Sequence, residues 1–409
     1  MAVWLNNIQL PVWLSNLAEN AKVSVRIENG VVTDVVNSDD AILSSQDSVW
    51  QGNGRLAISG LSEMHTHLDK TYTRHRLGRI KPGLLSAIEA MEKDKQEWDL
   101  ADLQIRMHQG LERAFLNGVT HMRTHIDWSG TTPPLAWQLF DDLSMQWRHN
   151  IHLERVALIP LPLFGDIHNS RTLAESIKQS DKAILGAFIH SSNYSESAME
   201  NLFTVATEFE LDLDLHINEE LQSADGLVWL ADYLNREGGF QGSMTCGHAC
   251  GLHVLSDEQV SGILTTFAKH NVTIVALPTT NLLLQDAVTG VTPTQRGITV
   301  VKEAVAHNVR VMFSSDNVAD AFCPYGDYNP ISVLKLACMA SQLDNPFEEW
   351  SQTVCSLTAE SSRSALVGKP ADFILFDHGN KHIWPEYQSV HIMRNGQWLK
   401  DAHNELGKD

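Results

Sequence analysis

Four side chains that commonly bind metals stand at or just after the ends of apolar, strand-like segments. They are His65, His67, His216 and Asp316. Three imidazoles and one carboxylate suit a single divalent metal ion. His65 and His67 are two residues apart, so on a strand they point to the same face. The sequence therefore predicts one metal site assembled from several strand ends.

Two further side chains near these residues can move protons. Glu219 follows His216 by three residues, and His248 ends the segment Thr245-Cys246-Gly247-His248. A metal ion that generates hydroxide beside a non-ligating Glu is a hydrolytic arrangement. Taken singly, each residue has a plainer interpretation: a core histidine, a solvated glutamate, or an aspartate that caps the helix after it. Taken together, the recurrence of such residues at strand ends favours an active site.

The elements that must bring these residues together are parallel strands alternating with helices. Helical patterns, such as Leu84 to Leu116 and Asp257 to His270, separate eight candidate strands. These strands span 56–64, 119–127, 153–160, 183–190, 211–217, 243–248, 272–278 and 309–315. Eight alternating units predict a closed (β/α)8 barrel of the TIM type, whose carboxyl strand ends meet at one face.

Both ends of the chain predict β-structure. Apolar alternation surrounds Asn29-Gly30 near the start and Asn395-Gly396 near the end, a pattern typical of β-hairpins. We expect a small β-sandwich domain formed by both termini, with residues 1–55 and 366–409 contributing to it and residues 56–365 forming the barrel.

The amino-acid composition limits the kinds of molecule that this protein is expected to bind. The 409 residues contain 30 Lys plus Arg and 50 Asp plus Glu, a net charge of −20, which disfavours binding to a nucleic acid polymer. No apolar run is long enough for a membrane span, and no secretory signal is visible. The five cysteines form no disulfide framework, and a zinc knuckle around Cys246 and Cys250 lacks a second pair of ligands. A cytoplasmic protein acting on a small molecule is expected.

The order of these motifs resembles the amidohydrolase superfamily. Within it, the bacterial cytosine deaminase branch is similar in several blocks between about 55 and 345. These blocks are Arg123 to Asp127, His216 to Glu219, Asn281 to Gln285, Arg296 to Glu303, and Pro324 with Gly326. The resemblance implies that His65, His67, His216 and Asp316 hold the metal.

The resemblance also bears on the number of metal ions. Two-metal members commonly place a carboxylated lysine at the end of the fourth barrel strand. Here that strand ends in His190, and Lys182 lies at its opposite end. One divalent metal ion, zinc or iron, is therefore expected.

The implied reaction is hydrolytic deamination of a cytosine-like base, cytosine or 5-methylcytosine, to uracil or thymine plus ammonia. Hydroxide generated at the metal would attack the ring carbon. His248 and Asp316 would orient the water and take its proton, and Glu219 would protonate a ring nitrogen and then the departing amine. The nucleoside-deaminase type of zinc site is not indicated, because His152-Leu153-Glu154 is not accompanied by Pro-Cys-x-x-Cys.

The chain departs from the cytosine deaminase pattern around the expected substrate. Leu161 falls near the position of a glutamine that reads the pyrimidine edge, and a leucine offers no hydrogen bond. Asn317 and Phe322 replace a family Asp and Trp, and Lys70 resembles relatives that act on s-triazines. Leu161, Asn317, Phe322 and Lys70 are thus candidate substrate-binding residues.

Alternatives to the cytosine-like substrate remain open at this stage. One is another amidine heterocycle, such as isocytosine, an s-triazine or a pterin. A non-catalytic metal-binding barrel is a second, disfavoured because Glu219 and His248 are retained. Family members often form homo-oligomers, so a homo-oligomer is also an expectation.

Overall fold

The computed structural model describes residues 2–359, 362–377, 384 and 390–399. Within these residues the Cα positions form two compact units. One comprises residues 63–114 and 121–341, and the other comprises residues 1–62, 115–120 and the region from 342 onwards. The domain boundaries at 55 and 365 stay a prediction. Among the helices of the described residues, none combines the length and apolarity needed to cross a membrane.

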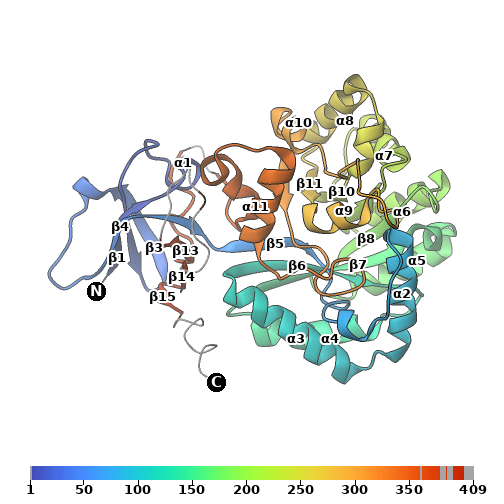
Figure 1. Ribbon diagram of the computed structural model, residues 1–409, viewed down its shortest axis with the longest axis horizontal. Coiled ribbons are helices and arrows are strands. Elements are labelled where there is room, and N and C mark those ends of the chain that lie inside the picture. Colours follow the sequence, from blue (N-terminus) through green and yellow to red (C-terminus); the bar gives the residue numbers. More distant parts are fainter. Residues whose placement is uncertain (1, 360–361, 378–383, 385–389, 400–409) are drawn as a thin grey trace. The chain divides into compact units, whose positions relative to one another are not determined.

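A barrel of parallel strands dominates the molecule (Figure 1). Its eight described strands pair in chain order: β5 (Leu61–Thr66), β6 (Val119–Asp127), β7 (His152–Pro160), β8 (Ile184–Ile189), β9 (Leu213–Ile217), β10 (Met244–His248), β11 (Thr273–Ala276) and β12 (Arg310–Phe313). The ring closes where Thr66 bridges Asp316, and the Asp316 backbone N–H donates to the His65 carbonyl at 3.0 Å. The predicted (β/α)8 class is confirmed.

Helices follow the strands and cover the outside of this sheet (Figure 1). They are α2 (Leu84–Asp94), α3 (Leu100–Leu116), α4 (Leu135–Trp147), α5 (Ile167–Lys178), α6 (Glu196–Glu208), α7 (Asp225–Glu237), α8 (Asp257–Lys269), α9 (Pro278–Leu284), α10 (Val301–Ala306) and α11 (Pro330–Ser341). Their ends follow ordinary capping chemistry. At α8, for example, the Ser256 hydroxyl accepts from the Gln259 N–H and the Gln259 side chain accepts from the Ser256 N–H.

The barrel interior contains ionisable side chains as well as apolar ones. Along β9, Leu213, Leu215 and Ile217 share one face, and Asp214 and His216 share the other. All five are buried. The Arg123 guanidinium on β6 donates to the Asp214 carboxylate at 2.7 Å, which identifies the polar face as the one turned into the barrel. Alternation along the strand therefore places His216 inside.

Two predicted elements are divided in the structure. The predicted first barrel strand, 56–64, spans the end of β4 (Ser48–Ser59) and the start of β5, with Gly60 between them. The apolar pattern runs through this break, so periodicity does not reveal it. The helical pattern from Leu84 to Leu116 is also divided into α2 and α3. α3 begins directly after Asp99, because the Asp99 carboxylate accepts from the Asp102 N–H and caps this helix.

Strands from both ends of the chain form the second unit. Its sheet has the order β15-β14-β13-β4-β1-β2-β3. The strands besides β4 are β1 (Val3–Gln9), β2 (Val23–Glu28), β3 (Val31–Asn37), β13 (Phe373–Phe376), β14 (Val390–Arg394) and β15 (Gln397–Trp398). Both predicted hairpins are present, with positive φ at Asn29-Gly30 and at Asn395-Gly396. The small domain from both termini is confirmed as a fold.

The junction that closes the barrel depends on one buried acid, and it can be tested. Glu63 on β5 accepts from Ser314 Oγ at 2.6 Å, Ser315 N at 2.8 Å and Ser315 Oγ at 2.5 Å. Glu63→Ala leaves these buried donors without an acceptor, so we expect the free energy of unfolding to fall by about 2–4 kcal/mol. Denaturant titration measures this, with the exposed Glu89→Ala on α2 as control. Equal stability of both variants would contradict the role given to Glu63.

Candidate active site

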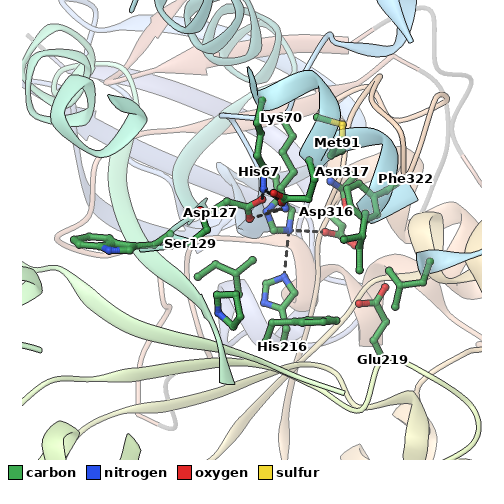
Figure 2. A pocket seen from close by; sticks show the side chains of 18 of the residues that line it. His67, Lys70, Met91, Asp127, Ser129, His216, Glu219, Asp316, Asn317 and Phe322 are labelled. Carbon is green, nitrogen blue, oxygen red and sulfur yellow. Dashed lines mark hydrogen bonds and ion pairs between the residues drawn. The ribbon is translucent and has the colours of Figure 1, made fainter. Parts of the chain in front are cut away.

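Four of the predicted residues converge at the carboxyl end of the barrel strands. His65 Nε2 lies 2.9 Å from His216 Nε2, which lies 3.2 Å from His67 Nε2. Asp316 Oδ1 lies 3.1 Å from His67 Nε2 and 3.6 Å from His65 Nε2. Figure 2 shows His67 between His216 and Asp316. Side chains up to 251 positions apart in the sequence thus each have a possible ligand atom within 3.6 Å of another's.

The spacing and protonation of these atoms fit a metal ion. Tetrahedral ligands about 2.0–2.1 Å from an ion lie roughly 3.4 Å from one another, close to the distances observed here. Burial, followed by the neighbouring imidazoles, holds the pKa of His65 and His216 well below the usual value. Burial and Lys70 lower the pKa of His67 to about 4. Neutral imidazoles have the lone pairs that a metal requires.

Asp316 supplies the negative charge of the cluster. Burial alone would raise its pKa, but the neighbouring His67 and His248 imidazoles outweigh burial and keep the pKa below the usual value. Its backbone has φ of +60°, a left-handed conformation that is uncommon outside glycine. The strand turns at this residue, which presents the carboxylate to the three histidines. The strain that this conformation introduces, about 1 kcal/mol or more, is typical of functional sites.

We call His65, His67, His216 and Asp316 the ligand cluster. The two expected proton-transfer residues lie beside it. Glu219 Oε2 is 3.8 Å from His248 Nε2. Asn218 has φ of +45°, and its side-chain oxygen accepts from the Leu227 N–H, so the chain after β9 is held in a tight turn. Burial raises the pKa of Glu219 to about 7, with His248 partly opposing the shift. A carboxyl group with this pKa can donate and accept protons near neutral pH.

A cavity adjoins the cluster, and most of its wall is apolar. His67, His216, Glu219, His248 and Asp316 form one part of it. The apolar wall contains three aromatic and five aliphatic or sulfur-containing side chains: Trp128, Phe188, Phe322, Leu84, Ile88, Met91, Leu158 and Pro160. Leu84, Ile88 and Met91 lie on one face of α2. A flat ring with one polar edge suits such a wall.

Charged groups lie at one edge of the cavity. The Lys70 ammonium is 2.8 Å from Asp127 Oδ1, and Lys95 pairs with the other Asp127 oxygen (Figure 2 shows Lys70 and Asp127). Burial alone would lower the pKa of Lys70, but Asp127 and Asp69 raise it above the usual value. Lys70 therefore stays an ammonium, 5.2 Å from the centre of the Phe322 ring. A cation and a carboxylate are available here to a substrate's polar edge.

The predicted substrate-binding residues fall into two groups. Lys70, Asn317 and Phe322 line the cavity, as expected for such a role. Leu161 is fully buried at the start of a short 3₁₀ helix, and Leu158 and Pro160 form the wall at this strand end instead. The Asn317 amide donates to Asp320 at 2.6 Å. Substrate contact by these residues stays a prediction.

Sequence reasoning assigned no role to several residues that the structure places near the site. Asp127 belongs to the Arg123 to Asp127 block, yet only the fold shows it between two lysines. The His125 ring lies 4.0 Å from that of His65. Two groups near the site have possible ligand atoms all within 4.8 Å of one another: His65, His125 and His216, and His65, His248 and Asp316. Gly247 is also essential to the packing, because a Cβ there would lie 2.7 Å from the His65 ring.

The ligand cluster predicts metal-dependent stability. Adding Zn²⁺ or Fe²⁺ at 100 times its dissociation constant should stabilise the protein by about 2.7 kcal/mol, because the ion binds only the folded state. His216→Ala should lose both this stabilisation and the bound metal measured by elemental analysis. His190→Ala, at the end of β8 and outside the cluster, should keep both. Full metal content in His216→Ala would contradict the assignment.

Comparisons with known proteins agree with this geometry. The model of the amidohydrolase family matches residues 136–394. A pterin deaminase from Rhizobium rhizogenes is 31% identical over 336 residues, covering 80% of this chain and 76% of the relative. An N-isopropylammelide isopropyl amidohydrolase from a Pseudomonas species is 21% identical, covering 90% of this chain and 92% of the relative.

Solved structures show the same fold. The 5-methylcytosine deaminase from Klebsiella pneumoniae, liganded with phosphonocytosine, superposes with a TM-score of 0.76 at 20% identity, covering 98% of each chain. The family model spans more than half of the chain, and the pterin deaminase covers four fifths of it. The chain belongs to the amidohydrolase family.

Proposed function

We propose that this protein is a metal-dependent hydrolytic deaminase of a pterin-like ring, a fused heterocycle with an amino group on an amidine carbon. The observation that carries the proposal is the pairing of Glu219 and His248 beside the ligand cluster, in the lining of a cavity with an extended apolar wall. The similarity to a pterin deaminase supports it. A structural metal site would need no such acid and base.

The ligand cluster would supply the nucleophile. His65, His67, His216 and Asp316 would hold one zinc or iron ion, and such an ion lowers the pKa of a bound water towards neutrality. The predicted mononuclear site is consistent with β8, which is followed directly by His190, whereas Lys182 lies before its first residue. The metal's identity is left open between zinc and iron.

Three side chains would move the protons. Glu219 donates a proton to the ring nitrogen beside the amidine carbon, which makes that carbon more electrophilic. His248 and Asp316 orient the attacking water, and His248 accepts one of its protons as the oxygen forms a bond to the carbon. Glu219, now a carboxylate 3.8 Å from His248 Nε2, takes up this proton. A proton then passes to the amino nitrogen, the carbon–nitrogen bond breaks, and ammonia leaves. Water and the amino compound thus yield the oxo compound and ammonia.

The edge of the ring would lie against the charged groups. Lys70 can donate to an exocyclic oxygen, and Asp127 can accept from a ring N–H or amino group. Both lysines at this edge pair with Asp127, and Lys95 also pairs with Glu92, so the edge offers donors and acceptors side by side. The aromatic wall would stack against the ring faces, and α2 would cover the second ring through Leu84, Ile88 and Met91.

The expectation of a cytosine-like substrate remains a competing proposal. A single pyrimidine ring would occupy the same place beside Glu219. It would leave more of the apolar wall without contact than a fused ring does, which is why the fused ring is favoured. Isocytosine carries the 2-amino-4-oxo pattern of a pterin on a single ring. Comparing it with pterin therefore measures the contribution of the second ring alone.

The substrate assay is direct. Metal-loaded protein should release ammonia from pterin with a higher kcat/KM than from isocytosine, and higher again than from cytosine or 5-methylcytosine. Glu219→Gln should lower kcat by about 10²–10⁴-fold, because it cannot donate the proton, while its metal content is unchanged. A higher kcat/KM for cytosine than for pterin would contradict the fused-ring substrate and favour the single pyrimidine ring. Metal binding without ammonia release from any of these rings would contradict deamination of this class.

The contribution of α2 can be separated from the chemistry. Ile88→Ala removes apolar contact with the second ring, so the ratio of kcat/KM for pterin to that for isocytosine should fall by about 10-fold. The neighbouring Leu85 is 60% exposed, and Leu85→Ala is the matched control. An unchanged ratio in Ile88→Ala would show that the fused ring does not lie against this helix.

A further inference from the structure

A chain of buried hydrogen bonds lies behind His248, on the side away from Glu219. His248 Nδ1 is 3.0 Å from Asn281 Oδ1. Asn281 Nδ2 is 3.0 Å from Cys250 Sγ, and Cys250 Sγ is 3.1 Å from the Gly297 carbonyl oxygen. Asn281 and Cys250 are completely buried. The proposed reaction gives no role to either residue.

The donors and acceptors of this chain can be ordered from its far end. The Gly297 carbonyl oxygen can only accept, so the Cys250 thiol donates to it. Burial raises the pKa of Cys250 above the usual value, so the sulfur keeps its proton. With its proton directed to Gly297, the sulfur can accept from the Asn281 amide nitrogen. The Asn281 oxygen then faces His248 and accepts from it.

We propose that Asn281, oriented by Cys250, is a positioning residue that holds His248 in the tautomer with the proton on Nδ1. In this tautomer the lone pair is on Nε2, the nitrogen 3.8 Å from Glu219 Oε2 and buried without a hydrogen-bond partner. The kinetic consequence of this inference rests on the proposed function, since a base must present a lone pair to the attacking water. The tautomer itself does not depend on the substrate.

The backbone around this chain is arranged to keep it in place. Gly297 has φ of +63°, and a Cβ there would lie 2.4 Å from Gln285 Cβ, so only glycine brings this carbonyl so near α9. The His248 carbonyl accepts from Thr299 Oγ1 at 2.6 Å, and His248 itself has φ of +67°. The segments around Asn281–Gln285 and Arg296–Glu303 thus meet behind one imidazole.

The opposite orientation of the Asn281 amide is the specific alternative. Its nitrogen would face His248 Nδ1 and its oxygen would face the thiol. The thiol would then donate to Asn281, and the buried Gly297 carbonyl would lose its donor. His248 would carry its proton on Nε2 and could not act as a base. The two orientations therefore predict opposite tautomers.

Nitrogen NMR of the zinc-loaded protein with ¹⁵N-labelled histidine distinguishes them without any substrate. Signals from His248 are assigned by their loss in His248→Asn. We expect Nδ1 to have the chemical shift of a protonated ring nitrogen and Nε2 that of an unprotonated one. In Asn281→Leu this preference should be lost. A protonated Nε2 in the wild-type protein would overturn the proposal.

Kinetics provide the second readout. Asn281→Leu should lower kcat on the preferred ring by about 10–100-fold with KM and zinc content little changed, because binding is kept and base catalysis is weakened. Asn281→Asp keeps the acceptor for Nδ1 and should retain most of kcat. Cys250→Ala should lie between the two, and the buried Cys355→Ala is its control. Wild-type kcat in Asn281→Leu, with the wild-type tautomer, would contradict the positioning role.

The two tests separate this inference from the proposed reaction. If no ring is deaminated but His248 shows the Nδ1 proton only while Asn281 is present, the positioning role stands and the reaction is wrong. If a ring is deaminated and Asn281→Leu changes neither tautomer nor kcat, the reaction stands and the positioning role is wrong.

Discussion

The site depends on one physical constraint: four buried candidate metal ligands at the carboxyl end of the barrel each have a ligand atom within 3.6 Å of another's. Lone pairs this close repel one another unless a cation or protons lie between them, and burial disfavours protonated imidazoles. A metal ion bound by these residues would resolve this conflict. The apolar faces of the strands fix the backbone rigidly enough to hold the ligands together before the metal arrives.

Several buried polar contacts serve this constraint. Glu63 ties β5 to Ser314 and Ser315, directly before the metal-ligand candidate Asp316. Arg123 pairs with Asp214, which lies two residues before His216 on the same face of β9. Left-handed backbone at Asn218, His248 and Asp316 turns the chain sharply at the strand ends. Strain and buried charge are thus concentrated where the proposed chemistry occurs, and the surrounding sheet supplies the stability that permits them.

The sequence predicted the barrel, the small sheet and the residues of the ligand cluster, because each depends on local signals: strand periodicity, Asn-Gly turns, and polar residues at strand ends. It did not predict the cavity wall. The inward face of α2 depends on how that helix packs, and Ile88 on α2 has no distinguishing pattern in the chain. Leu161 lies at the start of a 3₁₀ helix after Pro160 and is not among the residues that line the cavity, so its expected contact with the substrate stays a prediction. His125 resembles any core histidine until its distance from His65 is known.

The most direct test of the account is a crystal structure of the zinc- or iron-loaded protein with an anomalous difference map at the metal absorption edge. We expect one peak about 2.0–2.2 Å from His65 Nε2, His67 Nε2, His216 Nε2 and an Asp316 oxygen. A peak bound instead by His65, His125 and His216, without His67 and Asp316, would contradict the ligand set and the mechanism built on it.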